Sequence, residues 1–180
     1  MTAPHSAPET APNTARDPAL KIAPPAEAAA AVDKPLGCTC FKLRKLTRAM
    51  SRLYDQHMAA AGLKTTQYSV LSHASRAPLP VAELADRLGM ERTTLTRNLK
   101  PLMEAGWLAL QPGADSRQRI VTLTEAGMDK LKLSYPAWCG AQRAFEQLVG
   151  RDAVLALHGQ LESTMQQITP IIEDMSHADR

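Results

Sequence analysis

The chain has 180 residues, of which 44% are hydrophobic and only 4% aromatic. These values fit one domain with an interior built mainly from aliphatic side chains, as in helical proteins. The formal net charge of +3 permits an anionic partner but excludes the extreme basicity of histone-like proteins. No apolar run reaches the roughly 18–20 residues of a membrane span, and the three cysteines form no disulfide framework. We therefore expect a cytoplasmic protein with no membrane partner.

Residues 1–36 differ in composition from the rest of the chain. They hold seven of the thirteen prolines in an alanine-rich background with almost no large apolar side chains. Such a segment buries too little apolar surface to offset the conformational entropy that is lost on ordering. We predict a disordered tail here and assign it no function.

An amphipathic helix is predicted directly after this tail. Apolar positions recur at alternating spacings of three and four residues and stop before Gly62, as in a helix of about 20 residues that buries one stripe. These positions are Leu43, Leu46, Met50, Leu53 and His57. Five basic residues lie among them, and we interpret them as a solvated face. A second helix is expected to run to Ala74, with Thr65 or Thr66 as its N-cap.

Two short helices separated by a glycine follow. The first is expected over Val81–Leu88 and the second over Arg92–Ala105, with Gly89 in the turn and Glu91 as an imperfect N-cap. Pro101 lies inside the second helix, where proline removes a backbone hydrogen bond and bends the axis. Three leucines of this helix are expected to face inward: Leu95, Leu99 and Leu102.

A hairpin and two longer helices are predicted for the remaining chain. Strand-like segments at Trp107–Gln111 and Arg119–Leu123 flank a turn-rich linker. Thr124 is expected to cap a helix that reaches toward Leu148, and a last helix is expected over Asp152–Ile168. The predicted fold class is mostly α (α+β): a winged helix-turn-helix domain with a two-stranded β wing, joined to a helical region from both ends of the chain.

The second short helix and the hairpin carry side chains suited to DNA. A helix about 10–12 Å across enters the major groove, where arginine binds guanine through two hydrogen bonds and short hydroxyls allow close approach to phosphates. Arginines on the hairpin suit a narrow minor groove, and Asp115 can pair with one of them. The predicted DNA-binding residues are Arg92, Thr93, Thr94, Thr96, Arg97, Lys100, Asp115, Arg117 and Arg119.

Three motifs, in this order and spacing, resemble the MarR family of transcriptional regulators. They are LKTTQYSVL at Leu63–Leu71, ELADRLGMERTTLTRNLKPLMEAGWL at Glu83–Leu108, and DSRQRIVTLTEAG at Asp115–Gly127. The last resembles the wing signature of the family, with an aspartate, an arginine two residues later, and Leu-Thr-x-x-Gly after the second strand. The resemblance extends over about residues 40–172.

This resemblance implies a homodimer on a double-stranded DNA operator. In the family the first and last helices of the two chains interlock, and the two recognition helices meet successive major grooves of a pseudo-palindromic site. We accordingly expect residues 37–62 and 125–176 to form the dimerisation region and residues 63–124 the DNA-binding region. A repressor is the expected role, with a winged-helix module that contacts only proteins as an alternative.

The resemblance also implies a signal that adjusts DNA affinity. Members of the family sense small aromatic acids or phenols, or oxidants through cysteine. A buried arginine or histidine suits a carboxylate, and aromatic rings suit an aromatic plane. Each candidate also has a plainer interpretation as a core, dimer-seam or surface residue. The candidate ligand-binding residues are Arg48, Tyr54, His57, Tyr68, His73 and Trp138.

Cys38 and Cys40 are the candidates for a redox signal. A thiolate at the start of the first helix is stabilised by the helix dipole and by nearby lysine and arginine, although cysteine is more often simply a small buried residue. The sequence shows no set of nucleophile, base and orienting residue, so we expect no enzyme activity. It also shows no four-ligand zinc spacing, and we expect neither a metal nor a cofactor.

Overall fold

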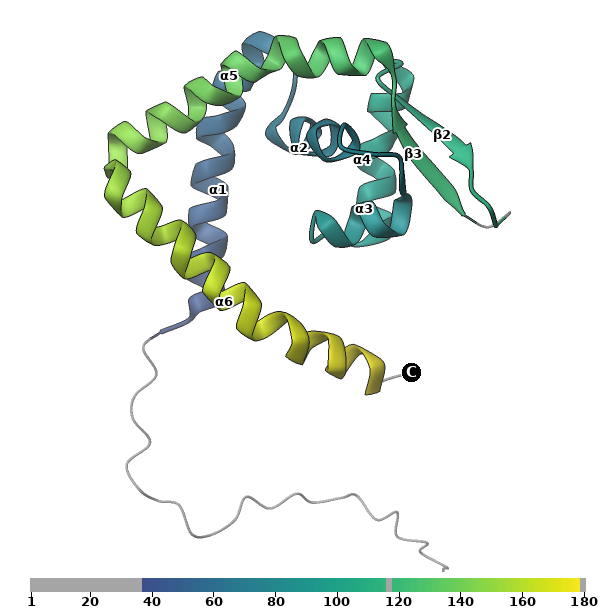
Figure 1. Cartoon of the computed structure of the whole chain (residues 1–180). Helices are drawn as coiled ribbons and strands as arrows, with labels where there is room; N and C mark the ends of the chain where they lie inside the picture. Colours follow the sequence, from purple (N-terminus) through teal and green to yellow (C-terminus); the bar gives the residue numbers. More distant parts are fainter. Residues whose placement is uncertain (1–36, 116–117, 179–180) are drawn as a thin grey trace, which may run out of the picture. The chain divides into compact units, whose positions relative to one another are not determined.

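The apolar periodicity of the sequence yields a mostly helical protein, seen in the computed structural model of Figure 1. The structure describes residues 37–115 and 118–178, so the predicted tail over 1–36 and Arg117 lie outside the described residues. From Thr39 onward the described residues form one compact unit. Its elements are α1 (Thr39–Met58), η1 (Ala59–Ala61), α2 (Thr65–Ala74), β1 (Leu79–Pro80), α3 (Val81–Arg87), α4 (Arg92–Glu104), β2 (Leu108–Pro112), β3 (Arg119–Leu123), α5 (Glu125–Val149) and α6 (Arg151–Ala178).

The small antiparallel sheet has the strand order β1-β3-β2. Strands β2 and β3 form the predicted wing, paired from Leu108 opposite Leu123 to Pro112 opposite Arg119. The third strand, β1, adds Leu79 opposite Val121 and was not predicted, because two residues are too few to show a strand pattern. The sheet therefore has three strands rather than two, and β3 is its centre.

The main core lies beneath α4 and the sheet. Leu95, Leu99 and Leu102 of α4 are at most 1% exposed, as their spacing predicted. They belong to one buried cluster with residues of α2, α3 and β3, among them Leu71, Leu84 and Val121. Burying these side chains is the main stabilising contribution to this lobe.

The end of α1 meets the start of α2 at a polar corner. Asp55 of α1 accepts hydrogen bonds at Oδ1 from both the backbone N–H and the hydroxyl of Thr65, each at 2.8 Å. The N-cap of α2 is Lys64, whose N–H donates to the side chain of Gln67 at 2.9 Å. The prediction that Thr65 or Thr66 is the cap was therefore wrong: a carboxylate from another helix binds the first N–H group of α2.

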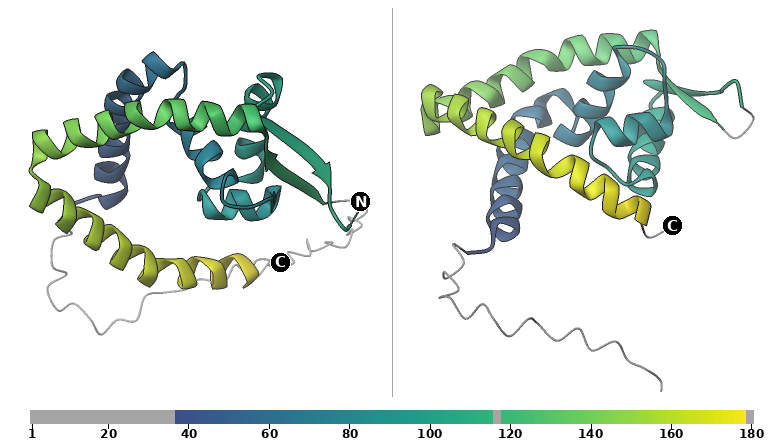
Figure 2. Two further views of the ribbon diagram at one scale, coloured as in Figure 1. Left: turned by 45° about the horizontal axis from the view of Figure 1, so that its top comes forward. Right: turned by 60° about the horizontal axis from the view of Figure 1, so that its bottom comes forward.

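Helix α5 connects the sheet to α1 and α6, and it packs against α1 along part of its length (Figures 1 and 2). It continues through Pro136, and Thr124 caps it as predicted by accepting from the N–H of Gly127. The last helix, α6, extends ten residues beyond the predicted end at Ile168. Among the residues that the structure describes, none of the helices combines the length and apolarity needed to cross a membrane.

The apolar stripe of α1 is only partly buried within one chain. Leu43 and Leu46 are 42% and 38% exposed, and on α6 Met165 and Ile168 are 56% and 47% exposed. The expectation of a buried stripe therefore does not hold for a single copy. The apolar periodicity therefore continues at positions where the described part of the chain leaves the side chains exposed.

Candidate functional site

The outer face of α4 carries six of the predicted DNA-binding residues, all exposed: Arg92, Thr93, Thr94, Thr96, Arg97 and Lys100. The buried leucines at Leu95, Leu99 and Leu102 fix this orientation, because residues three and four apart share one side of a helix. Glu91 occupies the N-cap position but makes no side-chain hydrogen bond to the helix. The first N–H groups of α4 are therefore not capped by a side chain at this position.

The polar groups on this face differ in how they are paired. The hydroxyl of Thr96 donates to the carbonyl of Arg92 at 2.8 Å, and Lys100 lies 3.9 Å from a carboxylate oxygen of Glu104. Arg92 and Arg97 have no acidic partner within the described parts of the chain. Their guanidinium groups retain a full set of donors for an anionic ligand.

Residues at the tip of the wing hold the turn together through the backbone. The N–H of Gly113 donates to the carbonyl of Gln118, and the N–H of Gln118 donates to the carbonyl of Asp115, each at 2.9 Å. Asp115 and Arg119 are exposed. The predicted contact residue Arg117 lies within the part of this turn that is not described.

A pocket of about 380 Å³ lies between α2 and α5; we call it the α2–α5 pocket. It is lined by Tyr68, Ser69, Ser72, His73, Arg76, Tyr135 and Trp138. The indole of Trp138 lies between two phenol rings, at 6.0 Å from Tyr68 and 5.9 Å from Tyr135, with interplanar angles of 15° and 21°. These three rings form a continuous aromatic surface.

The polar lining of the α2–α5 pocket holds one cation, Arg76, and a histidine whose neutral ring presents a hydrogen-bond acceptor. His73 Nδ1 lies 2.8 Å from the carbonyl oxygen of Ser69 and must carry the proton of this bond, because a carbonyl only accepts; Nε2 is then the remaining ring nitrogen. Arg76 is exposed and has no acidic partner among the described residues. Burial, followed by the neighbouring Cys139 and Tyr135, raises the pKa of Tyr68, so its phenol stays neutral at physiological pH.

The six predicted ligand-binding residues do not form one site. Tyr68, His73 and Trp138 come together in the α2–α5 pocket, whereas Tyr54 lines a different pocket and its hydroxyl donates to Gln142. Arg48 and His57 line neither of the two pockets.

Sequence reasoning missed four residues of the α2–α5 pocket: Ser69, Ser72, Arg76 and Tyr135. For Ser72 the signal was its four-residue spacing from Tyr68, which places both on one side of α2. Arg76 lies in the turn after α2, and Tyr135 lies on α5.

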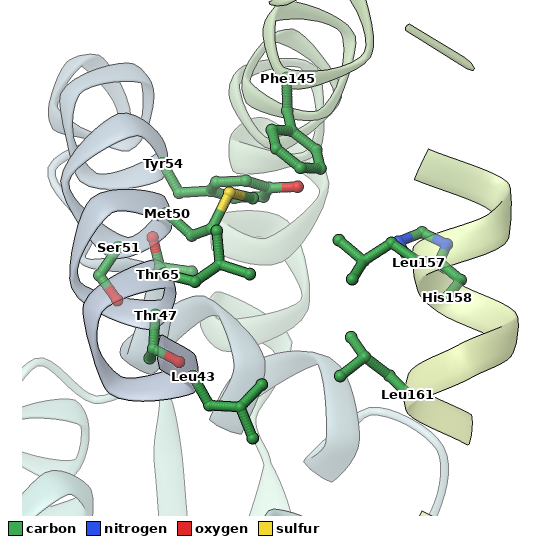
Figure 3. A pocket seen from close by; sticks show the side chains of 11 residues that line it. Leu43, Thr47, Met50, Ser51, Tyr54, Thr65, Phe145, Leu157, His158 and Leu161 are labelled. Carbon is green, nitrogen blue, oxygen red and sulfur yellow. The ribbon is translucent and has the colours of Figure 1, made fainter. Parts of the chain in front are cut away.

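A second pocket, the α1–α6 groove, has a volume of about 320 Å³ and mostly apolar walls. Figure 3 shows side chains of α1, including Leu43, Met50 and Tyr54, on one side and Leu157 and Leu161 of α6 on the other. The lining is completed by Leu46, Thr47, Ser51, Thr65, Phe145 and His158. An open groove with such walls has the composition of a protein–protein contact rather than that of a polar catalytic cleft.

The cysteines are not arranged as a metal site. Cys38 and Cys40 are both exposed, and Cys139 is partly buried. Within the described ranges no three residues among histidine, cysteine, aspartate and glutamate are grouped so as to hold a metal ion.

Comparisons with known proteins agree with this arrangement. A sequence model of the MarR family matches residues 61–119, which span α2 to the start of β3. The crystal structure of the M. tuberculosis transcriptional regulator MosR in complex with DNA is 34% identical, with a TM-score of 0.60 over 71% of this chain and 98% of that one. The transcriptional repressor CouR, bound to a 23-mer DNA duplex, is 23% identical with a TM-score of 0.65, over 71% of this chain and 92% of its own, and supports the fold alone.

A Bacillus subtilis protein described as an uncharacterized HTH-type transcriptional regulator, YwoH, is 29% identical over 90 residues. The match covers 49% of this chain and 66% of YwoH. With the family match, the 34% identity to MosR over nearly all of that protein and the winged helix seen here, the chain belongs to the MarR family of transcriptional regulators.

Proposed function

We propose that this protein is a homodimeric repressor that binds a pseudo-palindromic DNA operator and is released by a small aromatic acid or phenol. One observation carries the DNA-binding part: the outer face of α4 exposes hydroxyls and two arginines that have no acidic partner among the described residues, while its leucines are buried. That MosR, 34% identical to this chain, has been crystallised with DNA supports the same role here. In this proposal residues 63–124 bind DNA, and residues 37–62 and 125–176 form the dimer.

The proposed contacts divide by chemistry. Arg92 and Arg97 have the geometry to bind guanine edges or phosphates through two hydrogen bonds, and Thr93 and Thr94 allow the start of α4 to approach the backbone. At the wing, Arg119, together with Arg117 and Asp115, is proposed to contact the neighbouring minor groove. Lys100 is already close to Glu104 and is proposed to contribute mainly a long-range attraction to phosphate.

Operator binding by an arginine variant tests this proposal. A duplex is first selected from random-sequence DNA with the wild-type protein, and affinities are then measured at several salt concentrations. We expect Arg97→Ala to weaken binding by roughly 5- to 150-fold, the range for a lost bidentate contact. Arg143→Ala, which removes an exposed arginine of α5, is the matched control and should bind as the wild type does. Binding that neither salt nor Arg97→Ala weakens would favour the protein-interaction module instead.

For the effector, we propose that an aromatic carboxylate occupies the α2–α5 pocket. Its ring would lie against the surface of Tyr68, Trp138 and Tyr135, and its carboxylate would pair with Arg76. A ring hydroxyl of the ligand would donate to Nε2 of His73. A ligand that binds only the folded state raises the melting temperature. We expect benzoate or hydroxybenzoates to raise it, the uncharged benzamide to have little effect, and Arg76→Gln to abolish the increase.

Oxidation of Cys38 and Cys40 is the second candidate signal, supported by the exposure of both thiols beside the basic stretch of α1. Treating the DNA complex with peroxide distinguishes the two signals. Release by peroxide that Cys40→Ser prevents, with no response to aromatic carboxylates, would identify the thiols as the sensor.

A further inference from the structure

Lys130 on α5 joins two segments that are far apart in the sequence. Its side chain is partly buried, and Nζ donates a hydrogen bond of 2.6 Å to the carbonyl oxygen of Ala61. The same ammonium lies 4.7 Å from the centroid of the Trp107 ring. Ala61 is the last residue of η1, at the end of the helical stretch that α1 begins, and Trp107 directly precedes the wing strand β2. The proposed DNA contacts and the effector pocket do not include this lysine.

Both contacts suit a cation. The last carbonyl groups of a helical segment lack partners within the helix and carry the negative end of its dipole, so an ammonium stabilises them. The face of an indole is also electron-rich and attracts a cation that is partly shielded from water. Gly62, with φ of +63°, turns the chain away after Ala61, and a Cβ at that position would lie 3.7 Å from Lys130 Nζ.

Trp107 is in turn bonded to the elements proposed to contact DNA. The backbone N–H of Trp107 donates to the carbonyl of Leu102 near the end of α4 at 2.9 Å. The backbone carbonyl of Trp107 accepts from the N–H of Thr124 at 3.1 Å. Lys130 follows Gly127 by three residues, so both lie on the side of α5 that contacts Trp107. One ammonium therefore connects the end of α1 to the junction of the recognition helix and the wing.

We propose that Lys130 is a positioning residue that fixes α4 and the wing relative to α1, and so sets which separation of operator half-sites the dimer accepts. This inference rests on the proposed function, in which α1 belongs to the dimer contact and α4 enters the major groove. Adding one base pair between half-sites moves them apart by about 3.4 Å and rotates them by about 35°. A rigid junction lowers the affinity for an operator with altered spacing, whereas a loosened junction lets α4 and the wing move to the new half-site positions.

The test compares operators of different spacing. From the duplex selected with wild-type protein, two further duplexes are made with one base pair inserted or removed at the centre. We expect the wild type to prefer the original spacing by about tenfold or more. Lys130→Met keeps most of the length of the side chain without its charge and should reduce this preference to less than about threefold, while Lys130→Arg should restore most of it. Lys132→Met is the matched control, because Lys132 is an exposed lysine of α5 whose only ion pair among the described residues is with Asp129.

The melting temperature of Lys130→Met is compared with that of the wild type. If the two agree, a changed spacing preference reflects positioning rather than general destabilisation. If Lys130→Met weakens binding to all three duplexes equally, or discriminates spacing as the wild type does, the inference is wrong. If the wild type binds no duplex, the proposed function is wrong. If it binds all spacings with equal affinity, the dimer is not rigid. In either case this inference is wrong as well. Should Lys130→Met not fold, Lys130→Gln, which keeps a donor for Ala61 but no charge, is compared in the same way.

Discussion

Gly127 shows how a single missing side chain brings two elements together. It lies in the first turn of α5, and a Cβ there would overlap the carbonyl oxygen of Trp107 and lie 2.7 Å from Leu123 Cδ1. Thr124 completes this contact: its hydroxyl accepts from the N–H of Gly127 and donates to the carbonyl of Gly106 at 2.7 Å. The Leu-Thr-x-x-Gly motif therefore has a packing reason in this chain, independent of DNA.

We predict that Gly127→Ala lowers the free energy of unfolding by about 1–3 kcal/mol, the usual cost of overpacking a filled site. The neighbour is backbone, which cannot rotate aside as a flexible side chain does. Gly159→Ala in α6 is the control, since no atom of the described chain lies within 4 Å of the added Cβ; we expect no loss and up to about 1 kcal/mol of gain. Urea denaturation measures both. Equal stability of the two variants would show that Trp107 and α5 move apart readily.

A second prediction concerns Tyr54 and alkaline pH. Burial first, and then the negative charge of Glu146, raise the pKa of its phenol above the ordinary value of 10.0. Because the folded state favours the neutral phenol, its contribution to stability is complete below about pH 10 and is lost as pH rises through the raised pKa. Tyr54→Phe should therefore show a shallower decline of unfolding free energy above about pH 10 than the wild type. A decline equally steep in both would assign the alkaline instability to other groups.

At the scale of elements, α4 contains a residue that disfavours a helix. Pro101 lies inside α4, where it offers no N–H to the carbonyl of Arg97 four residues earlier. The helix nevertheless continues to Glu104, because Leu99 and Leu102 on either side of the proline are buried in the core. Tertiary packing therefore outweighs the local preference against a helix.

We predict that Pro101→Ala stabilises the protein, by up to about 3 kcal/mol, the difference between alanine and proline inside a helix. Pro101 is exposed, so alanine leaves no cavity in the core. Thermal and urea unfolding measure the gain, and Lys100→Ala, next to it on the exposed side, is the control with little expected change. A loss of stability in Pro101→Ala would mean that the proline restricts the unfolded chain more than it harms the helix.

The elements differ in how far local sequence determines them. Helices such as α1 and α4 were predictable because their apolar residues recur every three or four positions, and the same leucines predicted the outer face of α4. The cap of α2 was not predictable, because the carboxylate that accepts from the N–H of Thr65 belongs to Asp55 on another helix. The α2–α5 pocket was predicted in part: Tyr68 and Trp138 are 70 positions apart, and only packing of the two helices shows that Arg76 lies with them.

For the whole molecule, the important feature is apolar surface that one chain leaves in water. The α1–α6 groove combines Leu43 and Leu46 with Leu157 and Leu161, and beyond it Ile168 and Ile171 of α6 are exposed. Each square ångström of such surface removed from water contributes about 25 cal/mol, and contiguous patches of this kind mark interfaces. The contact between the first and last helices of two copies, which the family resemblance implies, would cover these same residues, and for this reason we propose the dimer contact here.

We predict that Leu46→Glu yields a monomer. A carboxylate in an apolar contact loses its hydration without gaining a partner, which should weaken association by more than about 100-fold. Leu133→Glu is the matched control: Leu133 is 73% exposed on α5 and does not line the groove, so this variant should remain a dimer. Sedimentation velocity at micromolar concentration distinguishes particles of 19.5 kDa from those of twice that mass.

The monomer should retain its helical content yet bind a full operator only as weakly as a single half-site, because two linked contacts hold DNA far better than one. A Leu46→Glu protein that still sediments as a dimer would place the contact on another face of the molecule.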